Sequence, residues 1–208
     1  MAVTVLPGLA LRVLASIQEK LAPVRRRHAE YLIPNLFYMQ ALLAIQRAPE
    51  RVWSGVADDA APAGNTRTLR PGECLGESEV ALLEEVVRRG LTGDGDGRPE
   101  LRRFRPIWGL LPAPYDAARP TRSQTALAVL YVMVRDGLQP THKFFGCVLS
   151  SLKNDGAVDA AEALLHAMDD YLEPPPHVKR AWVPGDRNFG WARPTRIEYG
   201  IAVHTAAQ

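Results

Sequence analysis

The feature that most limits how this chain can fold is a pattern of small and apolar residues that occurs twice. The first copy lies at positions 126–133, and the second lies 35 positions later, at 161–168. The matched residues are Ala126 and Ala161, Ala128 and Ala163, Leu130 and Leu165, and Met133 and Met168, with Pro140 matched by Pro175. Internal similarity with a period of about 20 to 50 residues is typical of solenoids built from stacked helical units. The sequence therefore predicts a helical repeat protein.

The clearest repeat unit, residues 141–176, has the signals of two helices joined by a tight turn. Thr141 is placed to cap the first helix, and the run 154–156, Asn-Asp-Gly, favours a turn after it. Asp159 followed by Glu162 is typical of the start of a second helix. The apolar stripes are Phe144, Phe145, Val148, Leu149 and Leu152 on the first helix, and Ala161, Leu164, Leu165 and Met168 on the second. One helix pair cannot bury both of its faces, so stacked neighbours are expected.

Residues 121–140 form the other clear unit, and helical spacing also occurs outside the two units. Thr121 and Gln124 form a capping box before a helix that Gly137 ends. Further helices are predicted over about 34–49, 78–89 and 99–110. The sequence thus predicts an all-α fold, a short α-solenoid of about seven helices in residues 1–176, with an irregular insertion at about 93–120.

The residues from 177 to 208 differ from the body of the chain and predict an extended tail that docks on a partner. Aromatic and basic side chains alternate in it with Pro and Gly, and this composition is typical of a protein interface. The residues expected to bind the partner are Trp182, Arg187, Phe189, Trp191, Arg193, Arg196 and Tyr199. Ile197, Tyr199, Ile201 and Val203 occupy every second position, which predicts a strand able to join a partner's sheet edge.

The first 27 residues combine apolar positions with five basic residues and a single acid, Glu19. The basic residues are Arg12, Lys20, Arg25, Arg26 and Arg27. This composition is typical of a mitochondrial targeting segment, and an amphipathic helix that belongs to the folded domain has the same composition. The sequence leaves these two interpretations open.

The repeat units resemble the pentatricopeptide repeat family. The stretch QPTHKFFGCVLSSLKNDGAVDAAEALLHAMDDYLEPP carries that family's helix-turn-helix pattern, with Phe145 as the aromatic early in the first helix and Gly156 in the turn. ALAVLYVMVRDGLQP is similar to the second helix and exit turn of the preceding repeat, and EVALLEEVVRRGLTG to the same element once more. The resemblance is specific over one and a half repeats.

The resemblance raises the possibility of RNA binding, since repeats of this family can each read one base through two or three side chains. Here the base-reading positions fall on Gly146 and about Pro175, neither of which has a side chain that can form hydrogen bonds. The net charge of only +2 also disfavours nucleic acid. A basic cluster at Arg98, Arg102, Arg103 and Arg105 is a candidate site for phosphate or for an acidic partner. A protein-binding scaffold is the favoured interpretation.

Short repeat proteins that look like this chain occur as accessory subunits of mitochondrial assemblies. The resemblance therefore implies a non-catalytic structural subunit on the matrix side of the mitochondrion, whose partners are protein subunits. The F1 sector of ATP synthase is ranked first, because an accessory subunit of that kind is similar in size, helix count and repeat content. The alternatives are a mitochondrial RNA-binding repeat protein and a subunit of the mitoribosome or of a respiratory complex.

The sequence patterns that could indicate catalysis, a cofactor or a metal are each incomplete. The run GDGDG at 93–97 places Arg98 and Arg105 where a calcium loop needs acidic ligands. The five histidines have no zinc spacing, and Cys147 lies on the inner side of a predicted core helix. We therefore expect no catalytic residue, no cofactor and no metal, and the sequence contains no uncharged apolar run of about 18 residues that would span a membrane.

Overall fold

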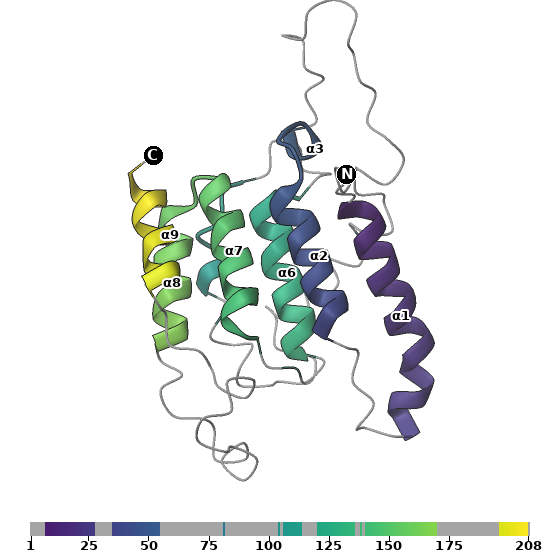
Figure 1. Ribbon diagram of the computed structural model, residues 1–208. Helices are drawn as coiled ribbons and strands as arrows, with labels where there is room; N and C mark the ends of the chain where they lie inside the picture. The colour runs from purple at the N-terminus through teal and green to yellow at the C-terminus, as the bar shows by residue number, and fades with distance from the viewer. Residues whose placement is uncertain are drawn as a thin grey trace, which may run out of the picture.

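A computed structural model of the chain describes residues 7–27, 35–54, 81, 104, 106–113, 120–135, 138, 140–169 and 196–207 (Figure 1). Within these ranges it contains seven α-helices and no strand, which confirms the predicted all-α class. The helices are α1 (Pro7–Arg27), α2 (Asn35–Arg47), α3 (Arg51–Ser54), α6 (Arg122–Arg135), α7 (His142–Asn154), α8 (Val158–Asp169) and α9 (Arg196–Ala206). Phe104 and residues 106–108 are also helical.

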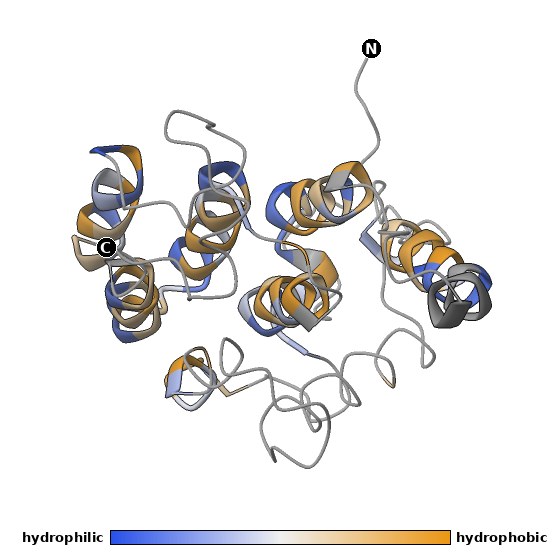
Figure 2. Ribbon diagram, turned by 90° about the horizontal axis from the view of Figure 1, so that it is seen from below, coloured by the Kyte–Doolittle hydropathy of each residue, from blue (hydrophilic) through white to orange (hydrophobic). Residues whose placement is uncertain are grey.

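The helices stand side by side in two rows, which are seen end-on in Figure 2. One row contains α9, α7 and α2, with α1 packed against α2 at its end, and the second row contains α8 and α6 behind it. Each rear helix contacts two front helices: α6 contacts α2 and α7, and α8 contacts α7 and α9. The stacked neighbours that the repeat units require are therefore present on both sides of the α7–α8 pair.

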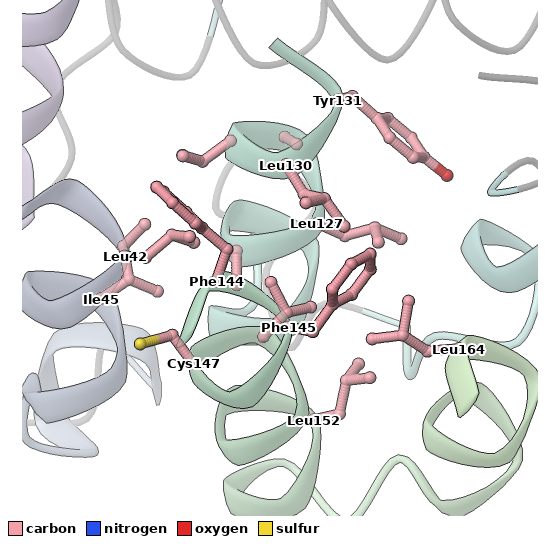
Figure 3. Packing of buried hydrophobic residues seen from close by; sticks show 14 of the residues in the cluster. Leu42, Ile45, Leu127, Leu130, Tyr131, Phe144, Phe145, Cys147, Leu152 and Leu164 are labelled. Atoms are coloured by element: carbon pink, nitrogen blue, oxygen red, sulfur yellow. The ribbon is translucent and has the colours of Figure 1, made fainter. Parts of the chain in front are cut away.

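Helix α7 lies at the centre of this arrangement and provides most of its contacts. Its residues Phe144, Phe145, Val148, Leu149 and Leu152, which are the stripe expected from the sequence, are all buried. Phe144 lies toward α2 and Phe145 toward α8, as Figure 3 shows. Because the two rings point in different directions from one helix, α7 contributes to the core on both of its flanks.

Most of the capping and turn interactions predicted around α6 and α7 are present. The Thr121 backbone N–H donates to Gln124 Oε1 at 2.9 Å, and the Gln124 N–H donates to Thr121 Oγ1 at 3.1 Å, so the capping box is formed. Gly156 follows the end of α7 with φ 65°, and its N–H donates to the Lys153 carbonyl. Thr141 is the N-cap of α7, but its side chain makes no capping hydrogen bond.

The helix that pairs with α6 was not identified from the sequence. Helix α6 packs against α2, although the residues between these two helices in the chain number more than a whole repeat unit. The turn around Phe104 packs behind α6, where the Tyr131 hydroxyl donates to the Phe104 carbonyl oxygen. The described residues therefore contain two helix pairs, α2–α6 and α7–α8, followed by the single helix α9. A solenoid of about three or more repeats stays a prediction.

Two expectations about the chain ends are decided by the described residues. The strand predicted over 197–203 is wrong, because these residues belong to α9, so the tail is not extended in its last part. Its buried positions are Glu198 and Thr205, two helical turns apart, so the buried stripe is polar and the alternating apolar residues gave a false period. Helix α1 buries Leu11 and Leu14 in the common core, which favours an amphipathic helix of the folded domain.

Two glycines of the α7 region should respond in opposite ways to alanine. Gly156→Ala places a Cβ at φ 65°, so we expect a loss of about 1 kcal/mol in the free energy of unfolding. Gly146→Ala lies inside α7, where the new Cβ meets nothing within 4 Å, and should gain about 0.5–1 kcal/mol. Urea denaturation followed by circular dichroism measures both values. Equal effects of the two substitutions would contradict the turn geometry.

Candidate functional site

Most of the residues that the sequence predicted to bind a partner lie outside the described residues. These are Trp182, Arg187, Phe189, Trp191 and Arg193 of the tail, and the basic cluster Arg98, Arg102, Arg103 and Arg105. Arg196 and Tyr199 are described, and both are exposed on α9. The structure therefore places two of the predicted partner-binding residues on the surface of the helix at one end of the front row.

Helix α9 packs on the core through Ile201 and Ala202, which are partly buried, and through two fully buried polar residues. The Glu198 side chain is only 3% exposed, and its Oε1 lies 3.6 Å from Nδ1 of His142 in the first turn of α7. Thr205, also buried, donates its hydroxyl to the Ile201 carbonyl at 2.8 Å. The helix packs against both α7 and α8. A buried carboxylate thus fixes which side of α9 faces the core.

The remaining surface of α9 presents apolar side chains to solvent. Ile197 is 71% exposed, Val203 is 70% exposed and Tyr199 is 46% exposed. At about 100° per residue these side chains are spread around the solvent side of the helix rather than aligned in one stripe. In helical repeat proteins the terminal unit normally has a polar outer face, because no further unit covers it. The outer face of α9 departs from this rule.

A second candidate site is a polar cluster around Arg122, where α3, α6 and α7 meet. The Arg122 side chain is 5% exposed, and its Nη2 donates to the Ala48 carbonyl at 3.0 Å and to Glu50 Oε2 at 2.9 Å. Its Nη1 lies 3.6 Å from Asp155 Oδ1, and the guanidinium carbon lies 5.9 Å from the centre of the Trp53 ring. One cation therefore joins the residues after α2 to the end of α7.

Asp155 joins the end of α7 to the start of α6. Its Oδ2 accepts a hydrogen bond of 2.8 Å from the Ser123 N–H and one of 2.6 Å from the Ser123 hydroxyl. Burial raises the pKa of this carboxyl group, and this effect outweighs the hydrogen bonds from Ser123 and the charge of Arg122, which lower it. The carboxylate adds to the Thr121 cap at the N-terminus of a neighbouring helix, where negative charge is favourable.

A cavity of about 350 Å³ opens beside this cluster. Its lining includes Glu50, Trp53, Arg122 and Asp155, together with Pro112, Ala113, Thr121 and Asn154. The charged groups that line it bind one another or backbone atoms. Among the described residues this arrangement cross-links the ends of three helices.

The other chemically reactive groups of the core are packed away from solvent. Cys147, as predicted, faces inward and is buried, and burial raises the pKa of its thiol although the positive charge of Arg47 lowers it. Burial also raises the pKa of the Tyr131 hydroxyl. A thiol with a raised pKa is mostly protonated at neutral pH and is a poor nucleophile. Both side chains serve packing.

Two further kinds of site are absent from the described residues. No group of three His, Cys, Asp or Glu side chains comes together there in a way that would hold a metal ion. Among the helices of the same ranges, none is long and apolar enough to cross a membrane.

Comparison of the chain with models of known protein families, with curated proteins and with solved structures gave no significant match. The function of the chain is therefore inferred from its own residues and geometry.

The Arg122 cluster was missed in the sequence, although one local signal indicates it. Arg122 directly follows the N-cap Thr121, and a cation in the first turn of a helix opposes the helix dipole. Such a residue needs acidic partners, and Asp155 of the turn after α7 is one repeat away in the chain. Glu50, in contrast, is 72 positions distant, and no local pattern relates it to Arg122.

Removing the central cation of the cluster should destabilise the fold. Arg122→Met keeps most of the volume but leaves the buried Asp155 without its cation, so we expect a loss of about 3 kcal/mol in the free energy of unfolding. The same exchange at Arg47, whose side chain is exposed, should change this value by about 0.5 kcal/mol or less. Urea denaturation of the two variants measures the difference. Equal values would show that the cluster contributes nothing to stability.

Proposed function

We propose that this protein is a non-catalytic structural subunit of a larger assembly and binds a neighbouring protein subunit through its helical array. The observation that carries this proposal is the outer side of α9. Ile197 and Val203 are the two most exposed large apolar side chains of the described residues, and both lie on the helix at the end of a row. Apolar groups gathered at such a place gain free energy when another protein covers them.

The polar groups of the described residues support a structural role. Arg122, Asp155 and Glu198 are used to join helices, and the thiol of Cys147 is buried in the core. Gly146, at a position where this type of repeat reads a base, has no side chain on the exposed side of α7. These features favour a protein partner over a catalytic or a base-reading function.

The assembly that we propose first is the F1 sector of a mitochondrial ATP synthase, with the protein docked on the outside of the catalytic head on the matrix side. This choice rests on the resemblance of the repeat units to accessory subunits of that kind. Respiratory complexes and the mitochondrial ribosome are the assemblies to compare with it. In each of them the chain would contribute contacts and no chemistry.

Replacing the exposed apolar residues of α9 should weaken partner binding without unfolding the chain. Ile197→Ser together with Val203→Ser removes two side chains that make few contacts within the chain, so we expect at least about tenfold less partner protein to be recovered with the tagged chain. The matched control is Leu9→Ser with Val13→Ser, two exposed apolar residues of α1. Quantitative mass spectrometry of the purified assemblies gives both yields.

If the α9 variant recovers as much partner protein as the wild type, the outer side of α9 is not an interface. If the two double variants lose partner protein equally, the loss reflects general hydrophobicity and the assignment to α9 fails.

A further inference from the structure

The two central helices of the front row, α2 and α7, contain no acidic residue. Their exposed charged residues are Arg47 and Lys143, and Lys153 is half-buried. On α8, in the rear row, the exposed charges Asp159 and Glu162 are acidic. The exposed charges of α2 and α7 are therefore basic and those of α8 are acidic, although the whole chain is close to neutral.

The exposed residues of α2 and α7 form two parallel stripes on one side of the molecule. On α2 the stripe is Leu36, Gln40, Leu43 and Arg47, and on α7 it is Lys143, Gly146, Ser150 and Asn154, at the spacing of one helix face in each case. Helix α6 packs behind both helices, so both stripes face away from it (Figures 1 and 2). We call these two stripes the α2–α7 face.

Contacts between the two helices show that the stripes are neighbours. The Asn154 side-chain amide donates to the Gln46 carbonyl at 3.3 Å, which joins the C-terminal ends of α2 and α7. The Cys147 side chain points from α7 toward α2 in Figure 3, and the charge of Arg47 acts on its thiol. Arg47 therefore stands at one end of a continuous face, and Lys143, in the first turn of α7, stands at the other end.

The α2 side of the α2–α7 face carries two leucines, and the α7 side carries small residues. Leu36, in the first turn of α2, is 61% exposed, and Leu43 is partly exposed two helical turns further along. On α7 a Cβ added at Gly146 would meet nothing within 4 Å, so the backbone there is open to close approach. A leucine stripe beside a small-residue stripe fits the side of a helix, because small residues let two helix backbones come close together.

We propose that the α2–α7 face binds an amphipathic helix of the partner protein, with apolar residues over Leu36 and Leu43 and acidic residues near Arg47 and Lys143. This inference rests on the proposed function and adds a second interface, distinct from the outer side of α9. The basic ends attract the acidic residues and set the direction of the bound helix, and the leucines supply the apolar contact. The helix-in-groove mode of recognition uses apolar anchors at the same spacing of three and four residues.

The same face does not suit a single strand of RNA. Proteins that bind single-stranded nucleic acid without reading its sequence stack the bases on aromatic side chains. The two stripes carry no aromatic residue: Tyr38 and both phenylalanines of α7 are buried in the core, and Phe37 is partly buried against it. The base-reading position of α7 is Gly146, which has no side chain that can form a hydrogen bond. The exposed leucine at position 36 would have no role against a phosphate backbone.

The test places a photo-crosslinking residue at Ser150 in the full chain and activates it in the assembly purified from cells. We expect a cross-link to one protein segment whose sequence, read by mass spectrometry, has apolar residues three and four positions apart and acidic residues at its ends. The same crosslinker at Glu162, exposed on α8, is the matched control and should not capture this segment. A nuclease-sensitive product, or a basic or non-helical segment, would overturn the proposal.

A charge reversal tests the ends of the face independently. Lys143→Glu places a like charge opposite the acidic partner residues, so we expect the amount of chain in the assembly to fall by about fivefold or more. Lys20→Glu, the same exchange at an exposed residue of α1, should leave it unchanged. A circular dichroism melt checks that both variants fold, and equal incorporation of both would overturn the proposal.

The outcomes also separate this inference from the proposed function. If the assembly contains the chain but the Ser150 crosslinker captures nothing, the α2–α7 face is not the interface, and the structural role stands. If the chain joins no protein assembly, the proposed function itself fails.

Discussion

The rest of the structure depends on the burial of α7 among four other helices. Phe144 and Phe145 are adjacent in the chain, and in a helix two adjacent side chains point about 100° apart, so one helix fills two separate parts of the core. Helices α2 and α6 lie on one side of it and α8 and α9 on the other. Each buried aromatic ring contributes about 2–3 kcal/mol of hydrophobic free energy. Among the described helices, the contacts that join α1, α2 and α6 to α8 and α9 run mainly through α7.

Polar contacts fix the register of helices that this apolar core alone would leave free to slide. Asp155 at the end of α7 accepts hydrogen bonds from Ser123 at the start of α6, and Arg122 ties both to Glu50 and to the Ala48 carbonyl. These hydrogen bonds are directional, since each donor must meet its acceptor at hydrogen-bond distance. On the other side of α7, the buried Glu198 of α9 lies 3.6 Å from Nδ1 of His142, close to it but without a hydrogen bond. The charged groups of the interior thus determine how the helices are aligned, and the surface is left for binding.

The parts of the fold that the sequence predicted are those that depend on neighbouring residues. The capping box of Thr121 and Gln124, the turn at Gly156 and the buried stripe of α7 are local patterns, and each is present. The pairing of α6 with α2 was not predictable, because it joins residues separated by a long stretch of chain and leaves no periodic signal. Helix α9 was read as a strand because its buried residues are Glu198 and Thr205, and a search for apolar periodicity ignores polar residues. The Arg122 cluster was missed for the same two reasons: its residues are charged, and they lie far apart in the chain.

The central claim is that the chain works as a structural part of a protein assembly, and the mass at which the native protein migrates tests it most directly. Gentle lysis of the source cells, native electrophoresis with and without ribonuclease, and detection of the chain give this mass. The account predicts that the chain migrates within a band far larger than its own 22.9 kDa, in near-stoichiometric amount with the other proteins of that band and unaffected by the nuclease. A free chain of 22.9 kDa, or a large band that ribonuclease disperses, would contradict it.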